Sequence, residues 1–226
     1  MDLFAELVAL LAPPSCPACR APVTDGRGGL CFPCRRSLPW LRGGRCPRCG
    51  LPGHEERQCR TRGGLTRAWA PMAYEGVARE LVGELKFRGR LPLSQLMAAQ
   101  LAANLPSDLR SSGAAVVPVP AHRGRRRRRG HDPVDAIASG FARRTGLDLR
   151  RCLRRTDSSA PQRGASRSAR TEAGRLSIEA TARAVPLRVL LIDDVHTTGA
   201  TFEACATALR AAGATWVAGV AYARTL

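Results

Sequence analysis

Two adjacent carboxylates and a hydroxyl-rich loop stand together near the end of the chain. The run VLLIDDVHTTGAT covers residues 189–201 and places Asp193 and Asp194 directly after four apolar residues. The loop residues that follow are Thr197, Thr198, Gly199, Ala200 and Thr201. Carboxylates accept hydrogen bonds from sugar hydroxyls, whereas backbone N–H groups and threonine hydroxyls donate to a phosphate. A sugar with vicinal hydroxyls and a phosphate would therefore satisfy both groups.

The surrounding residues predict a strand, a loop and a helix in that order. Residues 189–192 are too few for a helix and fit a strand buried on both faces. The segment FEACATALRAAG predicts a helix whose apolar face contains Phe202, Cys205, Ala206 and Leu209 and which stops at Gly213. Ligands of open α/β sheets bind outside the carboxyl ends of strands, and a helix N-terminus suits a phosphate. We therefore interpret Asp193 and Asp194 as a catalytic pair rather than as caps of a helix.

Most of the cysteines lie in one short segment with metal-ligand spacing. Seven of the nine fall between residues 16 and 59, and six of these form three CxxC pairs. They are Cys16, Cys19, Cys31, Cys34, Cys46, Cys49 and Cys59. Two thiolates two residues apart can chelate one ion from a tight turn, and a segment this poor in apolar side chains needs such support. The pattern predicts structural zinc rather than a disulfide framework.

The spacing suggests one complete zinc site and one incomplete site. Cys16, Cys19, Cys31 and Cys34 make up the complete set. The second set has three sulfurs, with Arg62 where a fourth cysteine is expected and His54 as the candidate fourth ligand. Two alternatives stay open on spacing alone: the second site is empty, or the pairs interleave.

Composition points to polyanionic partners. The 226 residues include 36 Lys and Arg against 18 Asp and Glu, a net charge of +18. Such a balance favours nucleic acid, pyrophosphate or both, with non-specific association as the alternative. No run approaches the roughly 18 apolar residues that span a bilayer. We therefore expect no membrane insertion and a cytoplasmic location.

The remaining pattern alternates strands with helices. Strands are predicted at residues 69–74, 114–120 and 215–221, and helices at 77–86, 92–105 and 133–144. Gly63 and Gly64 mark the boundary between an N-terminal cysteine-rich, zinc-binding module at residues 1–64 and an α/β domain at residues 65–226. The fold class predicted is α/β.

Arginines concentrate in two segments that lack apolar periodicity. One follows the strand ending in VPVP, and there we select Arg123 and Arg129 as ligands of a pyrophosphate. The other lies within the polar loop predicted over residues 153–176, which we interpret as a lid with Arg163 and Arg170 as contacts. A surface insertion is the alternative for this loop, and a solvated face is the alternative for most of the arginines.

The whole chain resembles the ComF family, which includes the proteins called GntX. The matching points are the paired cysteines, ELKFRGR, VPVP with RRRG, the APQ loop and VLLIDDVHTTGAT. The last run is also similar to the binding signature of type I phosphoribosyltransferases. The resemblance implies a zinc ribbon fused to a phosphoribosyltransferase-like parallel sheet with helices on both faces. It further implies a link to DNA uptake in natural competence, with single-stranded DNA and competence-machinery proteins as partners.

Two functional classes follow from the resemblance. In the first, phosphoribosyl pyrophosphate binds with Mg²⁺, and an unidentified nucleophile displaces pyrophosphate at C1 of the ribose. In the second, the same fold binds nucleic acid without transferase activity. The chain departs from the family pattern at Arg62, which stands in place of a cysteine. It also departs at His131 and Asp132, where the family has an aromatic residue and asparagine.

Overall fold

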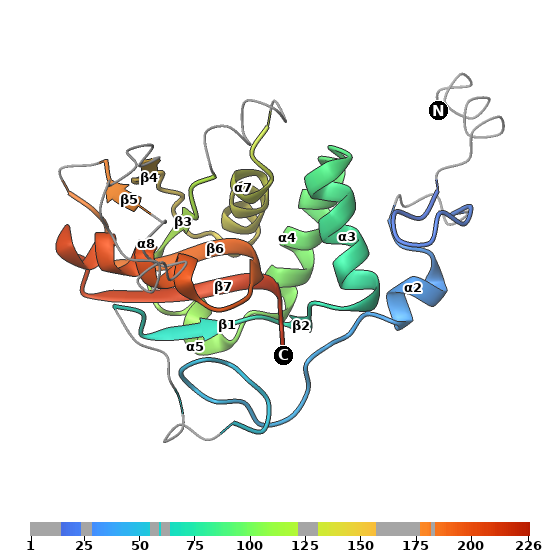
Figure 1. Ribbon diagram of the computed structural model, residues 1–226, viewed down its shortest axis with the longest axis horizontal. Coiled ribbons are helices and arrows are strands. Elements are labelled where there is room, and N and C mark those ends of the chain that lie inside the picture. Colours follow the sequence, from blue (N-terminus) through green and yellow to red (C-terminus); the bar gives the residue numbers. More distant parts are fainter. Residues whose placement is uncertain are drawn as a thin grey trace, which may run out of the picture.

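The fold is built on a parallel sheet. The computed structural model describes residues 15–23, 29–54, 59, 64–121, 131–156, 177–181 and 184–226. Within those residues, the main sheet has the order β1 (Arg67–Trp69), β7 (Trp216–Arg224), β6 (Arg188–His196) and β3 (Ala115–Pro118). A further strand, β2 (Met72–Ala73), also pairs with β7, and all these pairs are parallel. Figure 1 shows how the strands lie.

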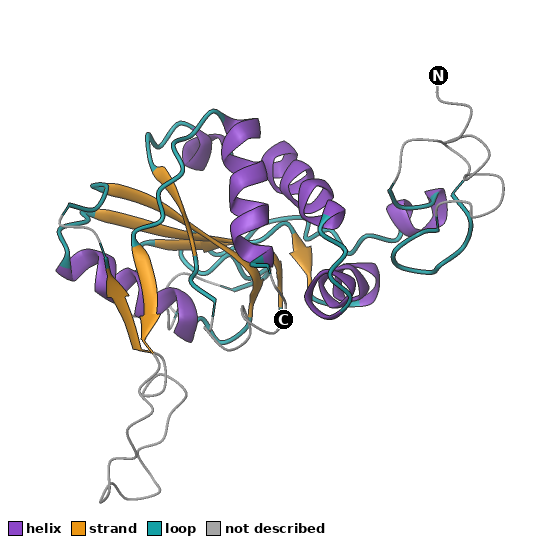
Figure 2. Cartoon of the chain, turned by 90° about the horizontal axis from the view of Figure 1, so that it is seen from above, coloured by secondary structure: helices purple, strands orange, loops and turns teal. Residues whose placement is uncertain are grey.

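Both faces of this sheet are buried. Along β6, Val189 and Leu191 pack into the apolar cluster that contains residues of α8 (Ala200–Ala211). Leu190 and Ile192 point the other way, into the cluster that contains residues of α3 (Gly76–Phe87), α4 (Pro92–Asn104) and α7 (Pro133–Thr145). Successive strand residues face opposite sides, so a strand covered on both faces reads as a continuous apolar run. The sheet therefore lies between α8 and the other helices (Figure 2), which confirms the predicted α/β class.

The helices predicted from periodicity are confirmed. In α7 the predicted inward residues Val134, Ile137, Ala138 and Phe141 are all buried. Asp132 caps this helix, and Gly146 ends it in the left-handed conformation at φ 72°. Beyond the predicted helices, α2 (Phe32–Arg36) and α5 (Ser107–Arg110) are single short turns that give no periodic signal. None of the described helices is long and apolar enough to cross a membrane.

Two sequence predictions need correction. The strand predicted over residues 69–74 is split into β1 and β2, because Pro71 has no N–H with which to continue the ladder. The loop predicted from residue 153 begins instead as β4 (Leu153–Thr156), which pairs antiparallel with β5 (Ser177–Ala180). Leu153 and Ile178 pack against the α8 side of the core, a long-range contact that a four-residue strand does not reveal in sequence. Residues 157–176 of the predicted lid lie outside the described residues.

Part of the N-terminal segment lies at one side of the molecule, and part of it is bonded to the sheet. The first cysteine-bearing turn and α2 lie at one side of the molecule, whereas the chain from Trp40 passes beneath β1 (Figure 1). There the segment is joined to the sheet by main-chain bonds. The N–H of Ala68 donates to the carbonyl of Arg48 at 2.6 Å, and the N–H of Ala73 donates to that of Pro39 at 2.9 Å.

Candidate functional site

The acidic pair lies at the carboxyl end of the central strand, within β6. The strand continues to His196, so Asp193 and Asp194 belong to it rather than follow it. Their side chains have different surroundings. Asp194 is 5% exposed and faces Lys86 on α3. Asp193 lies towards α8, where burial and then the charge of Asp193 raise the pKa of the Cys205 thiol.

Lys86 is a site residue that the sequence predictions did not assign. Its Nζ lies 2.8 Å from Oδ1 of Asp194, and its side chain is about three-quarters buried. It comes from the end of α3, far from the acidic pair in the sequence. One signal was available: Lys86 is the single lysine among 36 basic residues. Its flexible stem and point charge distinguish it from the arginines around it.

Asp193, the other carboxylate of the pair, is in an electrostatically unfavourable position. Burial raises the pKa of Asp193 well above its ordinary value, and the charge of Asp194 raises it further. The N–H of Asp194 donates to Oδ1 of Asp193 at 2.8 Å, and Lys86 also favours ionisation, but together they do not offset these effects. A hydroxyl donor or a hydrated cation that reached this carboxylate would stabilise its ionised form. The site therefore favours a hydrogen-bond donor or a cation beside Asp193.

A tight turn joins the acidic strand to α8. Gly199 is the N-cap of α8 and has φ 87°, a conformation that favours glycine. An added Cβ there would lie 3.1 Å from Nε2 of His196, so space is also limited. Thr197 and Thr198 are exposed. The first N–H groups of a helix have no acceptor within it. This turn and the start of α8, residues 197–201, are called the phosphate loop below.

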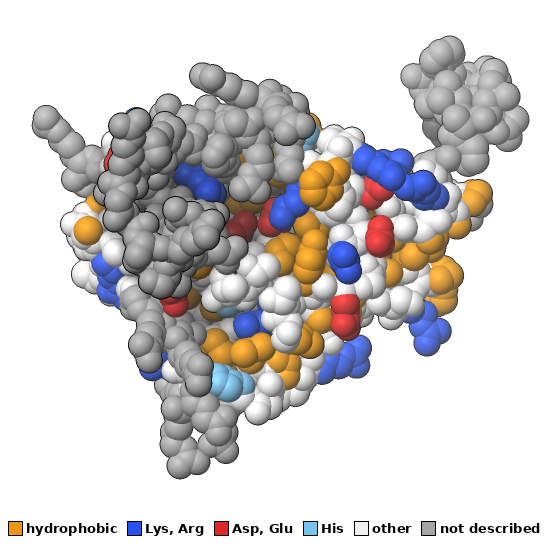
Figure 3. Space-filling view, in the orientation of Figure 1, with side chains coloured by type: hydrophobic (Ala, Val, Ile, Leu, Met, Phe, Trp, Pro, Cys, Tyr) orange, Lys and Arg blue, Asp and Glu red, His pale blue; other side chains and the backbone are white. Residues whose placement is uncertain are grey.

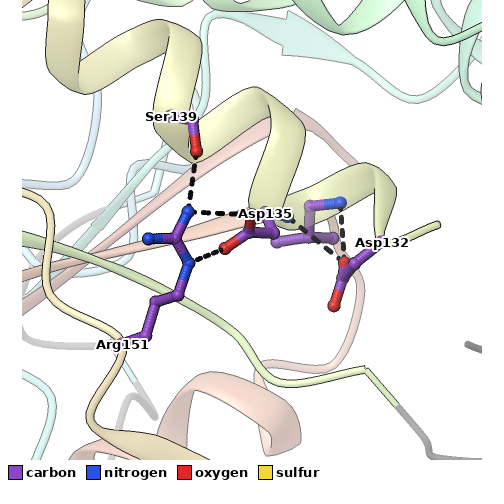
Figure 4. A network of polar contacts seen from close by, with 5 residues as sticks. Asp132, Asp135, Ser139 and Arg151 are labelled. Atoms are coloured by element: carbon purple, nitrogen blue, oxygen red, sulfur yellow. Dashed lines mark hydrogen bonds and ion pairs between the residues drawn. The ribbon is translucent and has the colours of Figure 1, made fainter.

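Asp132, a departure from the family pattern, has a local structural role. Its Oδ1 accepts hydrogen bonds from the N–H groups of Val134 and Asp135 at 3.1 and 3.2 Å, which caps α7. Arg151 holds the next carboxylate in turn: its Nε and Nη2 lie 2.6 and 3.0 Å from the oxygens of Asp135 (Figure 4). Asp132 therefore stabilises the start of α7 and is not simply an extra charge beside an anion site.

The cysteines and His54 form two compact clusters. Cys16, Cys19, Cys31 and Cys34 make up the first cluster, and Cys46, Cys49, His54 and Cys59 make up the second. Within each cluster all ligand atoms lie within 4.8 Å of one another. The clusters thus follow sequence order rather than an interleaved pairing, and His54 takes the fourth position. Four thiol or imidazole ligands at this spacing fit a tetrahedral zinc ion.

Two thiols of the first cluster have pKa values shifted in opposite directions. Burial opposes ionisation of Cys16, but the N–H groups of Cys19, Cys31 and Ala18 outweigh it and lower the pKa of the Cys16 thiol to about 6. Burial and the neighbouring cysteines raise the pKa of Cys34. The surroundings therefore favour the thiolate of Cys16, whereas a bound cation would be needed to favour that of Cys34.

The two clusters share one kind of turn. The N–H of Arg20 donates to the Cys16 carbonyl at 2.8 Å, and the N–H of Gly50 donates to the Cys46 carbonyl at 2.9 Å. Arg20 and Gly50 both have positive φ, 65° and 73°. At Gly50 an added Cβ would lie 2.7 Å from the carbonyl oxygen of Ala68 on β1, so only the second turn needs glycine for its packing.

A cavity of about 330 Å³ separates the second cluster from the phosphate loop. Its lining includes Cys49 and His54 from the cluster and Thr197, Thr198 and Gly199 from the loop. His196 and Arg224 line it as well and are only 7% and 4% exposed. Burial, together with the charge of Arg224, lowers the pKa of His196 to about 4, so this imidazole is neutral at physiological pH. Residues of the predicted zinc site and of the predicted phosphate site thus line the same cavity.

The arginines selected as pyrophosphate ligands fall outside the described residues. These are Arg123, Arg129, Arg163 and Arg170. Among the described side chains, Lys and Arg lie interspersed with Asp and Glu on the face seen in Figure 3. A second cavity, of about 350 Å³, opens at the carboxyl end of β3 and is lined in part by Arg154 and Arg155 of β4. Positive groups are thus present beside the strand end that precedes Arg123.

Comparisons with known proteins agree with the sequence motifs. The family described as Double zinc ribbon domain matches residues 7–61. The chain is 28% identical over 227 residues to the DNA utilization protein YhgH of Salmonella typhi, covering 96% of this chain and 100% of that protein. It is 26% identical over 214 residues to Competence protein F of Haemophilus influenzae, covering 88% and 91%. These matches confirm the predicted resemblance to the ComF family and the N-terminal zinc ribbon.

Among solved structures, that of the allosteric regulatory enzyme of purine biosynthesis is similar in part. It is 22% identical and covers 56% of this chain and 25% of its own chain, with a TM-score of 0.37. A likeness of this size does not bear on function.

Proposed function

We propose that this chain binds phosphoribosyl pyrophosphate, or a related phosphosugar, together with Mg²⁺. The observation that carries the proposal is the partly buried acidic pair at the end of β6, followed at once by a glycine-capped helix N-terminus. Carboxylates suit the ribose hydroxyls, and the helix N-terminus suits the 5-phosphate.

In this proposal each group has a separate task. Asp193 and Asp194 accept hydrogen bonds from the ribose hydroxyls or from waters of Mg²⁺, and Lys86 fixes the orientation of Asp194. The phosphate loop donates N–H and hydroxyl groups to the 5-phosphate. When bound, Mg²⁺ would neutralise part of the pyrophosphate charge. Catalysis at C1 would then depend on positioning and charge stabilisation, since the proposed mechanism needs no protein nucleophile.

The two cysteine clusters are proposed to hold structural zinc. A segment of this length with few apolar side chains gains most of its folding free energy from metal binding. The clusters would stabilise the N-terminal module and keep it against the sheet domain.

We further propose a role in DNA uptake, with single-stranded DNA as a ligand. Support comes from the names of the similar proteins, DNA utilization protein and Competence protein F. The net charge of +18 favours binding to a polyanion. The competing possibility is a nucleic-acid-binding module that uses this fold without transferase activity.

A binding experiment with three ligands tests the proposal. Thermal unfolding is followed with phosphoribosyl pyrophosphate plus Mg²⁺, with ribose 5-phosphate, and with a single-stranded oligonucleotide. We expect the first ligand to raise the melting temperature most, because it uses both the acidic pair and the phosphate loop. Absence of any shift with either phosphosugar would reject the site.

A second measurement separates the two functional classes. Release of pyrophosphate is followed on incubation with phosphoribosyl pyrophosphate, Mg²⁺ and mixtures of candidate nitrogen and oxygen nucleophiles. Release that depends on Asp193 supports the transferase. Binding without release in any mixture favours the non-catalytic module.

A further inference from the structure

Arg224 is a buried cation without a described acidic partner. It ends β7 and is 4% exposed. Its Nη1 donates to the carbonyl oxygen of Cys49, and its Nε has no hydrogen-bond partner. Among the described carboxylates, none forms an ion pair with it. A buried guanidinium needs a compensating negative charge, since removing an ion from water costs several kcal/mol.

The nearest source of negative charge is the second cluster. Arg224 bonds the carbonyl of Cys49 and lines one cavity with Cys49 and His54, and Cys46, Cys49 and Cys59 are the three sulfur ligands of that cluster. Three thiolates and one neutral imidazole around a divalent ion leave a net charge of −1. The buried Arg224 balances that charge, whereas the nearby Arg45 is only partly buried and donates to the carbonyls of Ala70 and Leu41. The replacement of a fourth cysteine by His54 therefore matches the presence of one buried cation.

We propose that Arg224 is the counter-charge of the metal-bound second cluster, and that it links this metal to the phosphate loop. The first half of this inference concerns metal binding alone. The second half rests on the phosphosugar function proposed above.

The link to the loop runs through the ends of two paired strands. His196 of β6 is in register with Arg224 of β7, and the N–H of Thr225 donates to the carbonyl of His196 at 3.0 Å. The ring of His196 packs beneath Gly199 and lies 5.3 Å from the ring of Phe202, centroid to centroid. Movement of Arg224 would therefore displace His196, on which the phosphate loop rests. In this arrangement Arg224 is a positioning residue and touches no reacting atom.

Variants at Arg224 test the counter-charge directly. Arg224→Met removes the charge and keeps most of the length, whereas Arg224→Lys keeps the charge. Arg210→Met is the matched control. Arg210 also joins the N-terminal segment to the sheet domain, with its Nε 3.0 Å from the Gly64 carbonyl, but it contacts neither cluster. The chain is purified with zinc, and zinc release to a chromophoric chelator is titrated.

We expect two zinc ions per chain in the unmodified protein. In Arg224→Met one of them should be released at chelator concentrations at least about tenfold lower, because a buried anionic site has lost its partner. Arg224→Lys should restore most of the difference, and Arg210→Met should match the unmodified chain. Equal release from all four proteins would overturn the inference. Equal loss in the Met and Lys variants would do so too, as would one zinc ion in the unmodified chain.

Ligand binding tests the second half. Under conditions that remove only the weaker zinc, affinity for phosphoribosyl pyrophosphate with Mg²⁺ should fall, and added zinc should restore it. Unchanged affinity would overturn the link between metal and loop. If the unmodified chain binds no phosphosugar at all, the proposed function fails, whereas the chelator titration still decides the role of Arg224.

Discussion

Nζ of Lys86 lies 2.8 Å from Oδ1 of Asp194, so a helix end and the central strand meet in one buried ion pair. Replacing Lys86 by Met leaves a buried carboxylate without its partner. We expect a loss of unfolding free energy of about 2–3 kcal/mol, below the full value for a buried pair because Lys86 is partly exposed. Denaturant unfolding measures the loss.

The double variant Lys86→Met with Asp194→Asn provides the control. Removing both partners should recover part of the lost stability, since neither charge is then left unpaired. Phosphosugar binding should be lost in both proteins. With Asp194→Asn as the second single variant, a double-variant loss equal to the sum of the two single losses would show that the pair contributes nothing as a pair.

Asp193→Asn should separate binding from stability. Because the folded protein holds the Asp193 proton to a higher pH than the unfolded chain, the charged form destabilises the fold. The stabilising effect of the proton is fully present below about pH 4, the ordinary pKa of aspartate. It is lost as pH rises through the raised pKa. Asp193→Asn should therefore be at least as stable as the unmodified chain at pH 7.5, with a flatter dependence of stability on pH.

Binding should respond in the opposite way. Calorimetry at pH 7.5 should show affinity for phosphoribosyl pyrophosphate reduced by about 100-fold or more, through loss of charged hydrogen bonds to the ribose. A stable variant that binds as tightly as the unmodified chain would remove Asp193 from the site.

Two glycines with positive φ offer a matched test of the phosphate loop. Gly199 and Gly213 have φ of 87° and 105°, but an added Cβ meets His196 only at Gly199. Alanine at either position should cost about 1–2 kcal/mol of stability through backbone strain. Only Gly199→Ala should also weaken phosphosugar binding, measured by calorimetry. Equal effects on binding would show that the loop has no special role.

Metal analysis should find two zinc ions per chain. Cys16→Ser with Cys19→Ser should remove one ion, and Cys46→Ser with Cys49→Ser should remove the other, because each pair belongs to a separate cluster. Chelation of both should lower the melting temperature. A stoichiometry near one would mean that the second cluster does not hold zinc, and a value of zero would contradict structural zinc altogether.

Salt dependence should reveal what the arginines bind. If residues 123–129 and 158–170 contact a DNA backbone, log affinity for a single strand should fall with log salt, with a slope of about −0.7 per phosphate contact. Replacing several of these arginines by glutamine should flatten the slope in steps. We also expect phosphoribosyl pyrophosphate with Mg²⁺ to compete with the strand, at least in part. Fully independent binding would place DNA elsewhere.

The elements that sequence analysis predicted correctly are those whose signal is local. The apolar stripe on α7 and the continuous apolar run of residues 189–192 are both visible within one short segment. Their burial can therefore be predicted without knowing which elements pack against them. The same holds for the phosphate loop, where strand, glycine and helix follow one another directly. A metal at the clusters and a ligand at the loop stay predictions.

What sequence analysis missed depends on distant pairing. Lys86 meets Asp194 only once α3 lies against the sheet, and β4 exists only because β5 pairs with it. Arg224 lies in an apolar strand whose pattern gives no sign of Cys49 behind it. In each case the partner comes from a distant part of the sequence, so the local pattern of apolar residues does not reveal it.

The hydrogen bonds between residues 39–48 and the chain from β1 to β2 bear on where this protein can be cut. Ala68 and Ala73 donate to residues 48 and 39, and Nη1 of Arg45 donates to the Ala70 carbonyl at 2.8 Å. Cutting the chain near residue 64 would strip these partners from an edge of the sheet and expose Met72, which is fully buried. The chain from Pro39 onward thus packs as part of the α/β fold. A recombinant fragment meant to fold independently should begin before Pro39.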